Sequence, residues 1–132
     1  MSKFAQGTQV SAEKSQMQVS KILKSYKCQS VMIGYEDSVF FVGFIRDKIQ
    51  VRLYCPVSES EPENRRRWRV MRIVLQSKFE IIQCGIKTFE EEFFADIVMP
   101  NGKTVWQTAL PSVRKALESQ KMPSTLLSLP EN

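Results

Sequence analysis

Apolar residues near the N-terminus recur at helical spacing. Four of them share the positions i, i+3, i+4 and i+7: Val19, Ile22, Leu23 and Tyr26. With Ser11 as a candidate N-cap, this spacing predicts an amphipathic helix over about residues 12–26, preceded by a flexible tail over residues 1–10. The basic residues of the segment fall opposite the apolar stripe: Lys14, Lys21 and Lys24. We therefore expect a surface helix with a basic outer side.

The periodicity changes in the next part of the chain. Three runs rich in β-branched and aromatic residues, 31–35, 39–45 and 49–55, are separated by short polar turns. This pattern predicts a three-stranded antiparallel meander. The middle run is apolar on both faces and should be the central strand, whereas the third run alternates and suits an outer strand with one solvated face.

A polar, acidic segment over residues 56–64 is expected to be a loop, and the longest helix should follow it over about residues 62–84. Pro62 suits the first turn of that helix, and Gly85 suits its C-terminal cap. Apolar side chains cover most of its circumference, so we expect a central helix with one exposed polar ridge. The ridge comprises Arg65, Arg69, Arg72, Gln76, Glu80 and Gln83.

Two capping-box patterns, at Thr88 and Thr104, predict shorter helices near the C-terminus. The first should open a helix around Phe89–Ala95, and the second a final helix that Pro111 should kink or split. Residues 122–132 are expected to form an extended tail.

Together these elements predict an α+β fold with an N-terminal helix, a meander, a long central helix and C-terminal helices packed on one sheet face. The 132 residues suit a single domain, with Trp68 and Trp106 in its core. No apolar stretch approaches the roughly 18 residues of a membrane span, and the N-terminus has no apolar signal-peptide core. We therefore expect no membrane contact and a location in the cytoplasm of a host cell.

Residue types needed for common catalytic sites are missing. The chain has no histidine, which excludes Ser-His-Asp and Cys-His catalysis and histidine-ligated zinc. Cys28, Cys55 and Cys84 are too far apart for a metal or redox pair, so we expect reduced, mostly buried thiols. The acidic run Glu90–Glu92 is explained by its place in a first helical turn. We predict no enzyme activity, no metal site and no cofactor.

The net charge of +5 is uneven, and its densest positive cluster is interleaved with Trp68. Arginine binds phosphates bidentately, so this cluster favours a polyanion as partner. The leading prediction is a non-catalytic nucleic-acid-binding accessory protein that contacts the phosphates of DNA or RNA. The predicted contact residues are Arg65, Arg66, Arg69 and Arg72, with Lys21 and Lys24 extending the track.

Three alternatives remain open. Glu59, Glu61, Glu63 or the run Glu90–Glu92 could neutralise the arginines, which would leave an ordinary solvated face. A protein-binding module, such as an inhibitor or adaptor, would use an exposed apolar patch or the edge strand around Arg52 and Tyr54. The third alternative is a homodimer whose basic ridge faces solvent.

The chain also resembles a group of small proteins encoded by bacteriophages, prophages and other mobile elements. Three segments carry the resemblance: Val10–Leu23, Arg65–Val105 and Met122–Leu127. The densest match is the stretch Cys-Gly-Ile-x-Thr-Phe-Glu-Glu-Glu-Phe that begins at Cys84. The resemblance implies a phage or mobile-element origin and brings no established activity and no catalytic residues. Such an origin is compatible with DNA metabolism and with interference with a host protein.

Overall fold

A computed structural model describes residues 3–125 of the chain, with side chains described from Lys14 onward. It has the predicted α+β fold with the elements in the expected order. These elements are α1 (Lys3–Ser25), β1 (Gln29–Glu36), β2 (Val39–Arg46), β3 (Ile49–Pro56), α2 (Glu61–Gln83), α3 (Phe89–Glu92), the 3-10 turn η1 (Phe94–Asp96) and α4 (Val105–Ser119). None of the helices in the described residues is long and apolar enough to cross a membrane.

The first helix starts earlier than expected. Residues 3–10 belong to α1, so the tail predicted over residues 1–10 is wrong for this stretch. Ser11 lies inside the helix rather than at its N-cap. The segment contains no proline, and adding a residue to an existing helix is much easier than nucleating one, so the helix continues past the candidate cap.

The three strands form the predicted antiparallel meander in the order β1-β2-β3, with β2 in the centre. Asp37 and Ser38 link β1 to β2, and Asp47 and Lys48 link β2 to β3. All four have positive φ angles between 50° and 68°, as two-residue hairpin turns of type I′ require. The register is regular between β2 and β3, and β1 pairs with β2 with one irregularity between Gln29 and Met32; Gly34 lies opposite Phe41, and Phe41 lies opposite Tyr54.

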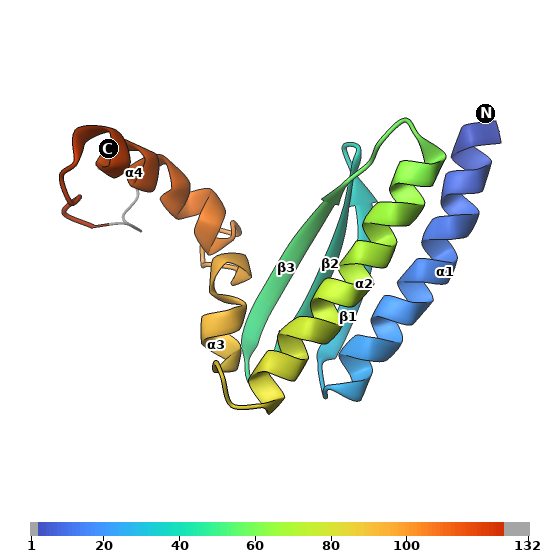
Figure 1. Cartoon of the computed structure of the whole chain (residues 1–132), viewed down its shortest axis with the longest axis horizontal. Coiled ribbons are helices and arrows are strands. Elements are labelled where there is room, and N and C mark those ends of the chain that lie inside the picture. Colours follow the sequence, from blue (N-terminus) through green and yellow to red (C-terminus); the bar gives the residue numbers. More distant parts are fainter. Residues whose placement is uncertain (1–2, 126–132) are drawn as a thin grey trace.

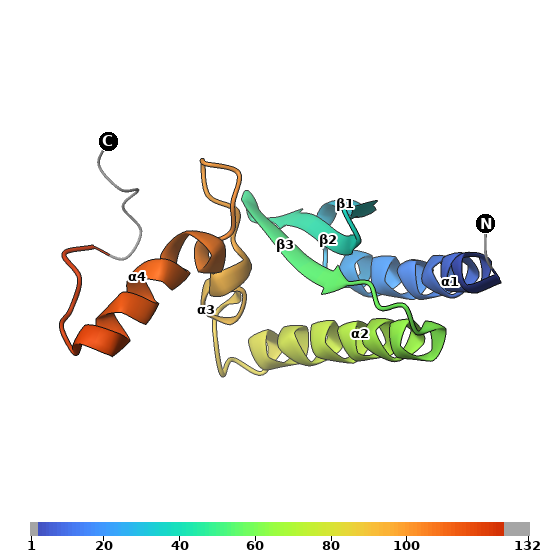
Figure 2. The ribbon, with the colours of Figure 1, turned by 90° about the horizontal axis from the view of Figure 1, so that it is seen from above.

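Helices α1 and α2 lie side by side on one face of the sheet (Figure 1). They run in the same direction, because the chain reverses four times, an even number, between α1 and α2. The view from above shows the two helices in one layer and the sheet in another (Figure 2). No helix among the described residues covers the opposite face of the sheet, and we call that face the open sheet face.

The core lies between the sheet and the helices, and aromatic rings fill the part of it near the C-terminal end of α2. Phe44 of β2 packs against Phe79, Phe89 and Phe93, with ring centroids 5.5–6.3 Å apart. Trp68 is buried against Phe40, with centroids 5.3 Å apart, as predicted.

Helix α2 is fastened at both ends. Ser60 accepts a hydrogen bond from the Glu63 amide, so the expected acidic loop over residues 56–64 shortens to residues 57–60. The buried side chain of Asn64 accepts from the Ser58 amide and donates to the Ser58 carbonyl, at 2.7 and 2.8 Å. At the other end Gly85 adopts a φ of 78° and closes the helix as predicted.

The predicted helix over residues 89–95 is divided into α3 and η1. The Thr88 capping box is present as predicted, but α3 ends at Glu92, because its C-cap residue Phe93 has a φ of −101°, which is not helical. As a result Phe93 is fully buried in the core, while its neighbour Phe94 is 55% exposed.

Helix α4 leads away from the sheet as an arm (Figures 1 and 2). Residues 97–105 form a small hairpin that bonds to the edge of β3, where the Val98 amide donates to the Gln50 carbonyl. Thr104 caps α4 as predicted, and Pro111 does not split the helix. The prediction that Trp106 lies in the core is wrong, since Trp106 is 42% exposed on this arm. Residues 122–125 lie outside helices and strands, and residues 126–132 of the predicted tail lie outside the described residues.

Candidate nucleic-acid interface

The parallel packing of α1 and α2 brings the predicted lysines and arginines to one layer of the molecule. We call their outward surface the basic helix face, and it comprises Lys14, Lys21, Lys24, Arg65, Arg66, Arg69 and Arg72. All are exposed except Arg72, which is half-buried. Across the described side chains of α1 and the whole of α2 there are nine basic and three acidic residues. The helix layer therefore carries a strong positive excess.

Tyr26 sets the register between the two helices. Its ring stacks on Phe79 with centroids 4.6 Å apart, and its hydroxyl donates to Glu80 Oε1 and accepts from Gln76 Nε2, both at 2.7 Å. The bond to Glu80 raises the pKa of Tyr26. Lys21 precedes Tyr26 by about 7.5 Å along the helix axis, which places it at the level of Arg72. The lysine track and the arginine ridge thus share the same levels along the helix layer, with the lysines on the outer side of α1.

Three arginines at the start of α2 are paired with carboxylates one turn earlier. Arg65 contacts Glu61 at 2.6 Å, and both Arg66 and Arg67 contact Glu63, at 3.3 and 3.2 Å. The hydrogen bond from Arg67 is the main reason that the pKa of Glu63 lies below its usual value. The charge-pairing alternative is therefore correct for these three arginines. Such exposed pairs contribute only about 0–1 kcal/mol each, so a phosphate can replace the carboxylate.

Arg69 and Arg72 differ from the three arginines before them. Among the described side chains, neither forms an ion pair or a side-chain hydrogen bond. They lie at i and i+3 on the predicted polar ridge, next to the α1 side of α2. Their guanidinium groups are the part of the ridge that is open to a ligand.

The acidic run after Thr88 does not reach the arginines. Glu92 contacts Lys78 at 2.8 Å and Lys87 at 3.6 Å, and the bond from Lys78 lowers its pKa. Glu91 accepts from the Thr88 amide in the capping box. Burial raises the pKa of Asp96. Within the part of the chain that the structure describes, no group of three or more metal-ligating side chains is found.

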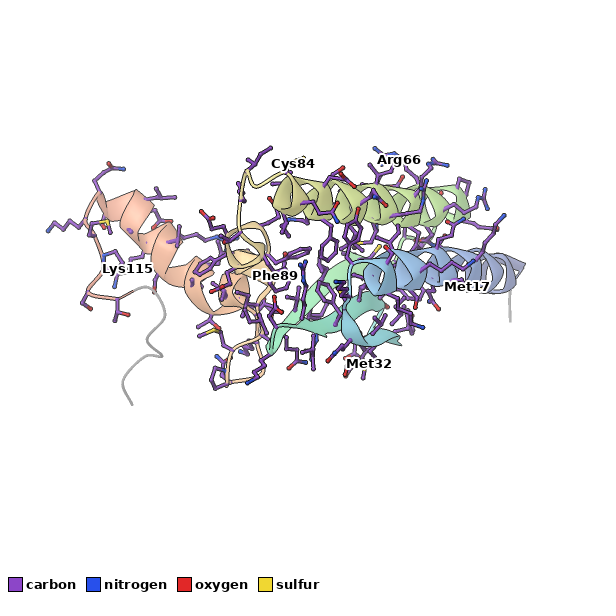
Figure 3. All side chains as sticks on the ribbon, turned by 90° about the horizontal axis from the view of Figure 1, so that it is seen from below. Met17, Met32, Arg66, Cys84, Phe89 and Lys115 are labelled. Atoms are coloured by element: carbon purple, nitrogen blue, oxygen red, sulfur yellow. The ribbon has the colours of Figure 1, made fainter. Side chains whose placement is uncertain are left out.

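Two of the three cysteines are buried as predicted, and one is not. Cys28 and Cys55 lie in the core, and burial raises the pKa of the Cys28 thiol to about 11. Cys84 is exposed because it occupies the C-cap of α2, where the chain turns away from the core. Figure 3 shows Cys84 at this end of α2, with Arg66 farther along the same helix.

The open sheet face carries a cluster that sequence analysis had only partly indicated. The Arg52 guanidinium lies 5.8 Å from the centroid of Phe41, and its Nη1 donates to Tyr54 Oη at 3.5 Å. The Phe41 ring lies so close to Gly34 that a Cβ at this glycine would be 2.4 Å from it. The sequence indicates Arg52 and Tyr54 as candidates for an edge-strand contact. The contact of Phe41 with Gly34 depends on cross-strand register, which the sequence pattern does not give.

Comparisons of the chain with protein-family models, curated proteins and solved structures find no match.

Proposed function

We propose that this protein binds nucleic acid without catalysis, through the basic helix face. The observation that carries the proposal is the side-by-side packing of α1 and α2, which joins cations from two distant segments into one surface. Arg69, Arg72, Lys21 and Lys24 would contact phosphates directly. Arg65 and Arg66 would join them by exchanging their glutamate partners for phosphate.

The chemistry of the surface fits a phosphate backbone. Duplex DNA carries one negative charge per about 1.7 Å of its axis, so a row of cations on two adjacent helices can neutralise several phosphates at once. Arginine adds bidentate geometry, and packed helix axes about 8–10 Å apart allow two rows to act together. Phosphate contacts position the partner and carry little sequence information. We therefore expect binding with weak sequence preference and strong salt dependence.

The test compares two double charge reversals that change the net charge equally. Arg69→Glu with Arg72→Glu should weaken binding of labelled DNA or RNA at least about tenfold at low salt, and should reduce the slope of log K against log salt by roughly two. The control is Lys103→Glu with Lys121→Glu, two exposed lysines that flank α4, and it should leave both quantities nearly unchanged. Fluorescence anisotropy across a salt series measures them.

Two outcomes contradict the proposal. One is an absence of binding by the unmodified protein to single- and double-stranded DNA and RNA at about 50 mM salt. The other is an equal loss in both double variants, because it would mean that net charge rather than the helix face determines binding.

A further inference from the structure

Helix α4 carries an apolar stripe that the described residues leave partly open. Trp106, Leu110, Val113 and Leu117 lie at i, i+4, i+7 and i+11, on one side of the helix. Trp106 and Leu117 are 42% and 67% exposed, and Leu110 and Val113 are half-buried. Among the described elements, α4 packs mainly on the short turn η1. Amphipathic helices of this kind normally bury their apolar side against another element.

The open sheet face is the second surface without a cover in the described residues. Alternation along the strands places its residues on the side away from α1 and α2, and they include Met32, Gly34, Phe41, Gly43, Ile45 and Tyr54. Met32 is 61% exposed, and Figure 3 shows it on the side of the sheet opposite to the helices. A Cβ at Gly43 would meet only backbone atoms, the nearest at 3.6 Å. The surface of the open sheet face is therefore lower at Gly43 than at the neighbouring Phe41 ring.

The two surfaces match in size but are kept apart within one chain. The 15 residues of α4 span about 22 Å, and an eight-residue strand spans about 26 Å. A helix about 10 Å wide covers two strands of a sheet. The hairpin over residues 97–105 directs α4 away from the sheet, so α4 does not reach the open sheet face of its own molecule (Figures 1 and 2).

We propose that the occupant is a second copy of this chain: α4 of each protomer packs its apolar stripe on the open sheet face of the other. The exchange is reciprocal and gives a closed two-fold dimer. One helix-on-sheet contact buries on the order of 800 Å², and the two together reach the roughly 1,600 Å² typical of a stable interface. Charge also fits, because Arg114, which flanks the apolar stripe of α4, can approach Glu36 and Asp37 at one end of the sheet.

The dimer is independent of the proposed nucleic-acid contact. Helices α1 and α2 cover the side of the sheet opposite to the new interface, so the basic helix face stays exposed on both protomers. A variant that dissociates the dimer therefore keeps its basic helix face, and a variant that reverses Arg69 and Arg72 keeps the dimer.

The experiment measures the mass of the full chain in solution by sedimentation equilibrium across about 5–200 µM. The unmodified protein should be a dimer. Leu117→Glu on the arm and Met32→Glu on the sheet should each weaken dimerisation at least about tenfold, because a buried unpaired carboxylate opposes each contact. Ile86→Glu is the matched control, since Ile86 is 71% exposed and lies outside both surfaces. Circular dichroism verifies that every variant is folded.

Mixing the two variants separates reciprocal exchange from other arrangements. The arm of the Met32→Glu chain and the sheet of the Leu117→Glu chain are both intact, so the mixture should form heterodimers with one good contact, more stable than either homodimer. The proposal is overturned if the unmodified protein is monomeric throughout the concentration range. It is equally overturned if folded Met32→Glu dimerises like the unmodified protein, since α4 would then dock elsewhere.

Discussion

Phe41 lies across the backbone of Gly34 on the open sheet face, and this contact depends on the glycine having no side chain. A Cβ at position 34 would meet two Phe41 ring carbons at 2.4 and 2.6 Å. The guanidinium group of Arg52 lies over the same Phe41 ring. One residue without a side chain therefore positions an aromatic ring and an arginine on two neighbouring strands.

Gly34→Ala should destabilise the fold by about 1–3 kcal/mol, because the Phe41 ring must leave its position to make room. Gly43→Ala is the matched control in the next strand. Its added methyl meets no atom closer than 3.6 Å, and alanine is less costly than glycine in a strand, so little or no loss is expected. Urea denaturation of both variants measures the difference, and equal losses would contradict the role given to Phe41.

Glu92 is a carboxylate whose ion pairs lower its pKa in the folded protein. Its pairing with Lys78 and Lys87 holds its folded pKa below the ordinary 4.5, so its contribution to stability is complete above that pH and is lost as the pH falls through the folded pKa. Asp96 acts in the opposite sense, since burial raises its pKa and its protonation favours the fold.

Glu92→Gln should therefore cost stability at pH 6–7, by roughly 1–3 kcal/mol, and should reduce the further loss between about pH 5 and 3. Denaturant melts at several pH values measure both effects. An acid-induced loss as steep in the variant as in the unmodified protein would contradict this assignment.

At the scale of elements, the short helix after Thr88 depends on two factors. A local sequence signal determines where it begins, and packing determines which of its side chains enters the core. The capping box is visible in the sequence and forms as expected. Which of two adjacent phenylalanines enters the core is decided by the end of α3 at Glu92. Three ring contacts, to Phe44, Phe79 and Phe89 at 5.2–5.5 Å, then hold Phe93.

Phe93→Ala should cost about 3–5 kcal/mol of unfolding free energy, because a fully buried ring leaves a cavity among three aromatic neighbours. Phe94→Ala removes an identical side chain from an exposed position and should cost less than about 1 kcal/mol. Thermal or chemical unfolding of the pair measures the contrast. Comparable losses would mean that α3 and η1 pack differently from the structure described here.

At the scale of the whole molecule, the topology gathers positive charge on one side. Among the described side chains of the parallel helices α1 and α2, nine are basic and three are acidic, although the chain as a whole carries a net charge of only +5. Repulsion within this helix layer opposes folding, and salt screens it over a distance of about 10 Å at 0.1 M.

Raising the salt concentration from about 0.05 to 0.5 M should therefore raise the melting temperature by a few degrees. The double variant Arg69→Glu with Arg72→Glu should show a smaller rise, because the two reversals relieve the repulsion. Differential scanning fluorimetry in sodium chloride measures both. An equal or larger rise in the variant would show that the layer is not under electrostatic strain.

The periodicity of the sequence was enough to predict the meander, the central position of β2, the long helix and its Gly85 cap. These features depend on interactions between residues near in sequence: alternation in strands, helical spacing, and caps within one turn. The exposed side of α1 and the polar ridge of α2 were predictable for the same reason. So was the burial of Trp68 among the apolar positions of α2.

The tertiary structure alone decided features that join distant residues. The pairing of Glu61 and Glu63 with three arginines is not among these features, because each pair lies within one turn of α2 and was open to sequence analysis. The register set by Tyr26 places Lys21 at the axial level of Arg72, and the hairpin on β3 turns Trp106 and α4 outward. Periodicity specifies which side of an element is apolar or charged. Which other element meets that side depends on chain reversal and packing across the fold, and no local pattern in the sequence encodes it.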